Sequence, residues 1–300
     1  MIFQKLKELS GHSAGIYSLA FDGQYLYSAS ADKFVARWNL ETGIQDKFAI
    51  KFESPVYSIS LLNINKFLAV GLANGDLHIF ELATRQEIKF FTQHRKAIFA
   101  ITENKPKNQF YTADADGNIS IWSSISLELM LYLPLDCGKI RRINVSKDGS
   151  YFALACQDET IRIFDTLVFN ETNVLSAHKN GATAVLFHPI FEDLLFSGGK
   201  DALLKLWNWK KNVLIEVIPA HNFVIYDILA INKGENIITS SRDKTIKIWD
   251  TQSLSFLQRL DLKLGGHKHS VNTILSLSED LFCSGSDDKI IKIWNELKTN

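Results

Sequence analysis

Five segments of this 300-residue sequence each combine a histidine, a hydroxyl residue and an aspartate, the residue types of a hydrolytic triad. In a triad the hydroxyl attacks the substrate, the histidine takes its proton and the carboxylate orients the histidine. A tryptophan also follows each hydroxyl by ten residues. The sets are His12, Ser28, Asp32 and Trp38; His94, Thr112, Asp116 and Trp122; His178, Ser197, Asp201 and Trp207; His221, Thr239, Asp243 and Trp249; and His267, Ser284, Asp288 and Trp294. Five copies of one catalytic site in a single chain make little sense, so a repeated structural role is the better interpretation.

The tryptophans belong to a longer pattern that runs through the whole chain. An Asp or Asn precedes a Trp or Phe by six residues seven times, and successive aromatic residues are 42, 42, 42, 43, 42 and 45 positions apart. The pairs are Asp32/Trp38, Asn74/Phe80, Asp116/Trp122, Asp158/Phe164, Asp201/Trp207, Asp243/Trp249 and Asp288/Trp294. Such a period indicates seven copies of one small unit, and each copy must stack on its neighbours to bury its apolar face. No stretch is left for a second domain, so we expect residues 1–300 to form one domain.

Each repeat has the pattern of four short β-strands. In repeat 6, two runs rich in Ile and Thr (236–241 and 245–249) flank a polar turn around Asp243, which is typical of a hairpin. One further run precedes this hairpin and another follows it. Since no segment has sustained helical periodicity, the sequence predicts an all-β fold, a seven-bladed β-propeller with four-stranded antiparallel blades.

The two ends of the sequence predict how this ring closes. Residues 3–9 precede the first histidine, at the place where every other repeat has its fourth strand. The seventh repeat, in turn, lacks a fourth strand after Trp294. We therefore expect the N-terminal strand to complete the last blade, which would remove an open sheet edge.

The histidines and the ends of the third strands carry a family signature. Gly-His pairs open repeats 1 and 7 at His12 and His267, and Ile-Trp-Asp (248–250) and Ile-Trp-Asn (293–295) end the third strands of repeats 6 and 7. With seven repeats in register, the whole chain resembles the WD40 repeat family. The resemblance implies a hydrogen-bond chain Trp38–Ser28–His12–Asp32 in repeat 1, with counterparts in repeats 3, 5, 6 and 7. The indole N–H would then occupy the hydroxyl that a triad needs for attack, so we expect no catalytic residue.

Repeats 2 and 4 have lost this set of residues as a group. Val70 and Leu154 stand where the other repeats have a hydroxyl, and Phe80 and Phe164 replace the tryptophan. A buried hydrogen-bond chain predicts such coupled loss. Removing one member strands its neighbours, whereas replacing all members by apolar groups can be nearly neutral.

The family resemblance also points to a face where a partner would bind. In the family, the face bearing the connection into the first strand commonly binds peptides or protein loops, and the residue five after the histidine points at the channel mouth. That position and two neighbouring ones carry aromatic, Lys and Arg side chains, types suited to interface hot spots. The predicted partner-binding residues are Tyr17, Tyr57, Phe99, Lys139, Arg141, Lys200, Tyr226 and Arg242.

These residues predict an apolar half of the face, in blades 1–3, beside a basic half in blades 4–6. Such a face suits a protein or peptide with a bulky aromatic anchor next to acidic or phosphorylated residues. The alternative is that the rings only pack across the channel and that the basic side chains are scattered on the surface. We therefore expect a non-catalytic scaffold or adaptor that binds partner proteins. The competing function is an enzyme or small-ligand binder that uses the aromatic-lined central channel.

Composition narrows the kind of partner and the compartment. Lys and Arg number 33, and Asp and Glu also number 33, so net charge attracts neither nucleic acid nor an anionic membrane. Cys137, Cys156 and Cys283 are few and odd in number, which fits reduced thiols and a cytoplasmic protein. His267 and His269 have no Cys or carboxylate at ligand spacing, so we expect no metal and no cofactor. A closed ring has no need to self-associate, so we expect a monomer.

Overall fold

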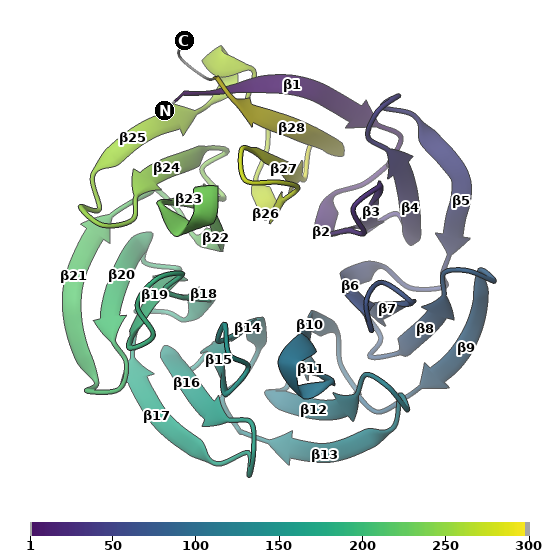
Figure 1. Ribbon diagram of the computed structural model, residues 1–300, viewed down its shortest axis with the longest axis horizontal. Coiled ribbons are helices and arrows are strands. Elements are labelled where there is room, and N and C mark those ends of the chain that lie inside the picture. Colours follow the sequence, from purple (N-terminus) through teal and green to yellow (C-terminus); the bar gives the residue numbers. More distant parts are fainter. Residues whose placement is uncertain (1, 298–300) are drawn as a thin grey trace.

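Each repeat folds into a four-stranded antiparallel sheet, and seven such sheets, or blades, stand in a ring (Figure 1). The structure is a computed structural model that describes residues 2–297. The chain passes from the innermost strand of a blade to the outermost and then enters the next blade. Family resemblance and strand pattern both predict this architecture, and the structure confirms it.

The strands of the first three blades follow from the axis outward. They are β2 (Ile16–Phe21), β3 (Tyr25–Ser30), β4 (Phe34–Asn39) and β5 (Gln45–Lys51) in blade 1; β6 (Val56–Leu62), β7 (Phe67–Leu72), β8 (Leu77–Glu81) and β9 (Gln86–Phe91) in blade 2; and β10 (Ile98–Asn104), β11 (Gln109–Asp114), β12 (Asn118–Ser123) and β13 (Leu129–Pro134) in blade 3.

Blades 4 to 6 repeat this order, and blade 7 takes its outermost strand from the other end of the chain. Their strands are β14 (Ile140–Val145), β15 (Tyr151–Cys156), β16 (Thr160–Asp165) and β17 (Glu171–Ser176); β18 (Ala182–Phe187), β19 (Leu194–Gly199), β20 (Leu203–Asn208) and β21 (Val213–Pro219); β22 (Ile225–Ile231), β23 (Asn236–Ser241), β24 (Ile246–Asp250) and β25 (Phe256–Leu260); and β26 (Val271–Ser276), β27 (Leu281–Ser286), β28 (Ile290–Glu296) and β1 (Phe3–Ser10). Three single 3-10 turns complete the elements: η1 (Lys105–Lys107), η2 (Asn232–Gly234) and η3 (Leu262–Leu264). None of these helical segments is long or apolar enough to cross a membrane.

Strand β1 closes the ring as the sequence predicts. It pairs antiparallel with β28 from Phe3 opposite Glu296 to Ser10 opposite Ile290. Phe3 and Leu9 are 2% and 1% exposed, so the strand is anchored in the core at both of its ends. In Figure 1, β1 lies beside β28 as the outermost strand of blade 7.

The apolar core lies between the blades. The buried side chains of the described residues form seven clusters, and each cluster joins two consecutive blades. At the seam of blades 2 and 3, for example, Phe67 and Ile79 pack with Ile98 and Trp122. A blade alone would expose this apolar surface, which is the reason why the repeats must stack.

Hydrogen bonds join the innermost strands at all seven seams. At each seam a polar side chain of one blade bonds to the backbone of the innermost strand of the following blade. In blade order the pairs are Ser18 with Ile59, Ser58 with Ile98, Thr102 with Ile143, Asn144 with Phe187, Thr183 with Ile225, Asp227 with Ile274 and Asn272 with Ile16. The inner wall of the propeller is therefore a circle of direct contacts, and this circle fixes the strands that carry the candidate site.

Candidate partner-binding site

The innermost strand of every blade contains a β-bulge at the position predicted to face the channel mouth. In β2, Ile16 pairs with Ser30 and Ser18 with Ala29, so Tyr17 is an extra residue between two regular pairs. A bulge bends its strand locally and turns the extra side chain away from the sheet face. The seven bulged residues are Tyr17, Tyr57, Phe99, Arg141, Thr183, Tyr226 and Asn272.

The bulged residues surround one cavity of about 330 Å³. Lys139, Arg142 and Asp287 complete its lining. We call this space the mouth cavity. Its wall receives a residue from every blade.

Three aromatic rings form a row along one side of the mouth cavity. The rings of Tyr17 and Tyr57 meet edge to face with centroids 5.1 Å apart, and Tyr57 stacks on Phe99 at 5.0 Å. These separations are those of favourable aromatic pairs. The rings pack on one another, as the alternative interpretation predicts, and they still leave the cavity open beside them.

Two cations lie over the end of this row. The Lys139 ammonium is 4.7 Å and the Arg141 guanidinium carbon 4.8 Å from the centroid of Phe99, within cation–π range. Burial lowers the pKa of Lys139, and repulsion from Arg141 and Lys200 lowers it further. Burial also lowers the pKa of Arg141, an effect that Tyr226 opposes and Arg142 reinforces. The electrostatic environment at this end of the row therefore disfavours additional positive charge.

A carboxylate lies at the opposite end of the row. Asp287 Oδ1 accepts a hydrogen bond of 2.7 Å from the Asn272 amide. A Cβ atom added to Gly15 would lie 2.6 Å from this same oxygen, so the glycine leaves room for the carboxylate. Burial raises the pKa of Tyr17, and the charge of Asp287 raises it further. The mouth cavity thus has a basic end and an acidic end.

Beneath the mouth cavity an ion pair crosses the channel. Arg142 of β14 in blade 4 pairs with Asp227 of β22 in blade 6, so the ion pair spans blade 5. Asp227 also accepts a 3.0 Å hydrogen bond from the backbone N–H of Ile274. Burial raises the pKa of this carboxyl, and Arg142 opposes the rise. The pair forms a polar floor between the mouth cavity and the remainder of the channel.

The structure brings together most of the predicted partner-binding residues and leaves two outside. Tyr17, Tyr57, Phe99, Lys139, Arg141 and Tyr226 all line the mouth cavity, whereas Lys200 and Arg242 are exposed and do not line it. Lys200 is near enough to Lys139 to affect its pKa. Arg142 and Asp287 also line the cavity but were not predicted as site residues, and Arg142 meets its partner Asp227 only when blades 4 and 6 come together in the ring. Whether any of these residues binds a partner stays a prediction.

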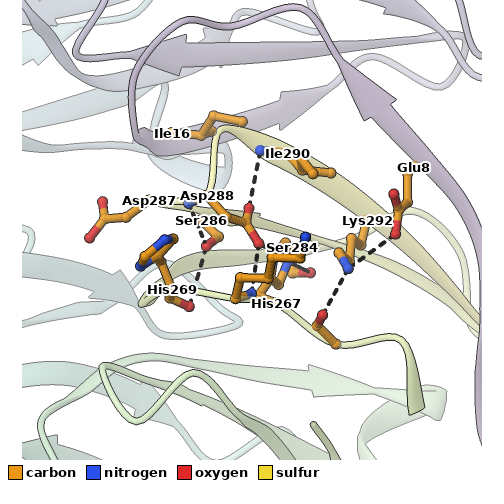
Figure 2. A network of polar contacts seen from close by, with 12 residues as sticks. Glu8, Ile16, His267, His269, Ser284, Ser286, Asp287, Asp288, Ile290 and Lys292 are labelled. Atoms are coloured by element: carbon orange, nitrogen blue, oxygen red, sulfur yellow. Dashed lines mark hydrogen bonds and ion pairs between the residues drawn. The ribbon is translucent and has the colours of Figure 1, made fainter. Parts of the chain in front are cut away.

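The predicted hydrogen-bond chain is present in repeats 1, 3, 5, 6 and 7, and Figure 2 shows His267, Ser284 and Asp288 of repeat 7 in contact. In repeat 7 the Trp294 indole donates to Ser284 (2.9 Å), the hydroxyl lies 2.8 Å from His267 Nε2, and His267 Nδ1 lies 2.9 Å from Asp288. The same three contacts occur at 2.7–3.0 Å in repeats 1, 5 and 6. Trp209, two residues after Trp207, is a separate aromatic residue that packs in the seam of blades 4 and 5.

Ionisation of the chain follows from burial and hydrogen bonding. Burial lowers the pKa of His267 although Asp288 opposes this, so the imidazole is neutral and can accept from the hydroxyl. Burial disfavours the ionised form of Asp288, but hydrogen bonds from His267 and from the backbone of Lys268 and Ile290 lower its pKa to about 2. The hydroxyl is thus held between an indole donor and an imidazole acceptor, which suits a structural role.

In repeat 3 the prediction that Asp116 contacts the histidine is wrong. His94 Nδ1 lies 2.8 Å from Asp114, and the predicted Asp116 is exposed and only donates its backbone N–H to Asp114 at 2.9 Å. Asp114 ends strand β11, two residues after Thr112, and hydrogen bonds from Asn118 hold its carboxylate against the histidine. The other hydrogen bonds of this repeat, from Trp122 to Thr112 (2.9 Å) and between Thr112 and His94 (2.7 Å), are as predicted.

We expect Ser284→Ala to lower the free energy of unfolding by about 2–6 kcal/mol, because it strands two buried groups, the Trp294 indole and His267 Nε2, at roughly 1–3 kcal/mol each. Beside Trp294→Phe the same change should cost about 1–3 kcal/mol less, since the indole donor is then absent. Urea unfolding of the four proteins measures the coupling. Trp122→Phe, in the distant blade 3, is the control and should combine additively with Ser284→Ala. Additivity in the Trp294 cycle as well would contradict the hydrogen-bond chain.

The described residues contain no group of three His, Cys, Asp or Glu side chains placed to hold a metal ion. The described cysteines Cys137, Cys156 and Cys283 are buried and free.

Comparison with known proteins agrees with this architecture. The family model described as "WD domain, G-beta repeat" matches residues 3–39, 85–123, 169–208, 212–250 and 258–295. These five segments are the repeats that contain the Trp–hydroxyl–His chain. The unmatched repeats 2 and 4 are those in which apolar residues replace the hydroxyl and the tryptophan of the hydrogen-bond chain.

The chain is also similar to several longer curated proteins. It is 26% identical over 299 residues to the 66 kDa stress protein of Physarum polycephalum, covering 96% of this chain and 47% of that protein. It is 23% identical to an uncharacterized WD repeat-containing protein of Schizosaccharomyces pombe, covering 96% of this chain and 69% of that one. A stretch of 127 residues, 41% of this chain and 28% of the relative, is 32% identical to the nuclear distribution protein nudF of Aspergillus niger. The chain thus spans about half the length of the first relative and a smaller part of the third.

Proposed function

Since this chain belongs to the WD40 repeat family, we propose that it is a non-catalytic scaffold that binds a partner protein at the mouth cavity. Propellers of this family generally serve as protein-interaction scaffolds. The observation that carries the proposal is that all seven innermost strands bulge at one level and turn their side chains into a single cavity. Bulges of this kind re-aim side chains and are common beside functional sites.

The composition of the mouth cavity suits a protein interface. Aromatic and Arg side chains are enriched among residues that dominate binding energy, and they act best in pockets that exclude water. Here Tyr57 and Phe99 are stacked and held from behind by the inner strands, so little side-chain freedom is lost on binding. A peptide or loop with an aromatic anchor could extend the row of rings, and its acidic groups would meet Lys139 and Arg141.

The setting of this interaction is also part of the proposal. We infer a reducing compartment, the cytoplasm, because the three cysteines are free and buried. We also infer that the propeller acts as a monomer, since the ring is closed by β1 and no outer sheet edge is needed for closure.

The cavity volume keeps a second function open. About 330 Å³ lies at the lower end of the range for small-molecule sites, roughly 300–1,000 Å³. A small ligand held between the aromatic row and Arg141 would make this protein a ligand binder or an enzyme. Such a ligand would protect the folded protein against heat without any partner protein present.

Affinity capture from the source cells tests the scaffold role. We expect Tyr57→Ala/Phe99→Ala/Tyr226→Ala to lose the proteins that the parent retains, because it removes three rings from the cavity wall. The matched control is Leu129→Ala/Met130→Ala/Tyr132→Ala, which removes exposed residues of similar size from the outer strand β13. Both variants must melt cooperatively before capture. Equal retention of partners by the two variants would reject the mouth cavity as the binding site.

A further inference from the structure

Arg141 lacks the counter-ion that every comparable arginine has. Four arginines of the described chain are at least partly buried, and three of them pair with carboxylates: Arg37 with Asp46, Arg142 with Asp227, and Arg162 with Asp158 and Glu171. Arg141 is the fourth. Among the described residues its side-chain contact is the face of Phe99, and no acceptor binds its N–H groups.

An unpaired, partly buried guanidinium lowers the stability of the folded protein unless an anion binds to it. Its charge persists at all physiological pH values, so it cannot lower the cost by losing a proton. Partly burying an unpaired charge lowers stability. The contact with Phe99 recovers only a part of this cost, because cation–π contacts are weaker than a paired, hydrogen-bonded charge.

The groups around Arg141 could complete an anion site. Lys139 supplies a second cation over the same ring, and it too has no carboxylate partner among the described residues. The hydroxyl groups of Tyr17, Tyr57 and Tyr226 lie near enough to influence Arg141 electrostatically and can each donate a hydrogen bond. Arg142 is excluded from this role, because Asp227 already neutralises it.

The acidic end of the cavity limits what else the ligand can carry. Asp287 is fixed by Asn272 beside Tyr17, so a second anionic group in the cavity would be repelled. A cation on the neighbouring residue of the ligand would instead be attracted. The cavity therefore distinguishes a single anion followed by a cation from a run of acidic residues.

We propose that the mouth cavity binds one anionic group, the carboxylate or the phosphate of a partner loop, on Arg141 and Lys139, with a cationic neighbour directed to Asp287. This inference rests on the proposed scaffold function and names the chemistry that the partner must present. Carboxylate and phosphate both present at least two oxygen atoms that can accept the two parallel hydrogen bonds of a guanidinium.

Fluorescence anisotropy with three short labelled peptides tests the inference. The peptides are Ala-Phe-X-Lys-Ala with Asp, phosphoserine or Asn at X, each measured against the intact chain at 50 and 150 mM salt. We expect the better of the two anionic peptides to bind roughly tenfold to a hundredfold more tightly than the Asn peptide, the range of a charge-assisted hydrogen-bonded pair. Whichever anion binds better identifies the source of the group.

Three variants locate the effect. Arg141→Met keeps the stacking on Phe99 and should reduce binding of the anionic peptides to that of the Asn peptide. Arg259→Met removes an exposed arginine of the outermost strand β25, outside the cavity, and should leave all affinities unchanged. Asp287→Asn should abolish the preference for Lys over Ala at the fourth position, measured with a further anionic peptide that has Ala in place of Lys, while the anion preference remains.

Equal binding of all three peptides, absence of binding, or equal losses in Arg141→Met and Arg259→Met would overturn the anion site. The scaffold function would survive each of these results, provided that capture of partners still depends on Tyr57, Phe99 and Tyr226. It fails only if that triple variant retains its partners, so the two failures are distinguishable.

Discussion

A variant with both Phe3 and Leu9 replaced by alanine should lose about 5–10 kcal/mol of folding stability, the summed cost of two large-to-small core substitutions. Both side chains are almost fully buried, Phe3 in the seam of blades 6 and 7 and Leu9 in the seam of blades 7 and 1. Domains of ordinary stability have only about 5–15 kcal/mol in total. Removal of residues 1–9 should therefore leave a protein that does not unfold cooperatively, because β28 becomes an open edge as well.

Thermal and urea unfolding measure the effect of closing the ring. Leu6→Ala is the matched control, since Leu6 lies in the same strand but is 56% exposed, and it should change stability by less than about 0.5 kcal/mol. A synthetic peptide of residues 1–10, added to the truncated chain, should restore cooperative melting by filling the vacant edge. A truncated protein that melts at the parent temperature would show that blade 7 holds without β1.

The sequence was sufficient for the fold because every blade repeats the same few constraints. The repeated spacing between the turn Asp and the third-strand Trp predicts the number of blades, and the position of residues 3–9 predicts how the ring closes. The coupled loss of Trp, hydroxyl and His in repeats 2 and 4 indicates a buried chain. These signals are local in sequence, since each one lies within a single repeat or at its boundary.

The hydrogen-bond chain of repeat 3 was predicted with the wrong aspartate, because this repeat has two aspartates that could contact His94. Asp114 and Asp116 both follow Thr112, and the regular spacing of four residues favoured Asp116. In the structure Asp114 forms the hydrogen bond with His94, because a hydrogen bond from Asn118 fixes the Asp114 carboxylate. The side chain of Asn118, four residues after Asp114, therefore decides which aspartate contacts His94, and the spacing between hydroxyl and aspartate cannot predict such a contact.

The mouth cavity could be predicted only in part for a different reason. Its bulged positions recur at a fixed distance from the histidine, so Tyr17 and Arg141 were found by register. Their neighbours across the ring were not, because Arg142 and Asp227 are 85 residues apart and meet only after closure. The predicted basic half included Lys200 and Arg242, which share the face but not the cavity.

Replacing Arg142 by methionine should cost about 3–5 kcal/mol, the usual penalty for leaving one member of a buried ion pair uncompensated. Asp227 would keep its backbone hydrogen bond to Ile274 but lose its only described cation. Adding Asp227→Asn should recover most of this loss, because the amide oxygen can still accept from Ile274 and no charge remains buried. Urea unfolding at pH 7.5 of the parent, both single variants and the double variant measures these terms.

The pH dependence separates the charge of Asp227 from a mere packing defect. Burial already raises the pKa of this carboxyl in the folded protein, and loss of Arg142 raises it further. A carboxyl with a higher pKa in the folded state binds more protons there than in the unfolded state, so stability falls as pH rises through the folded pKa and returns on acidification. The gap between Arg142→Met and Arg142→Met/Asp227→Asn should therefore narrow from pH 7.5 to pH 5.5, while the histidine chains contribute equally to both proteins and cancel. If the two variants are equally stable at both pH values, the loss belongs to the missing Arg142 side-chain volume, which both variants share, and the floor of the mouth cavity would then be held by packing instead of charge.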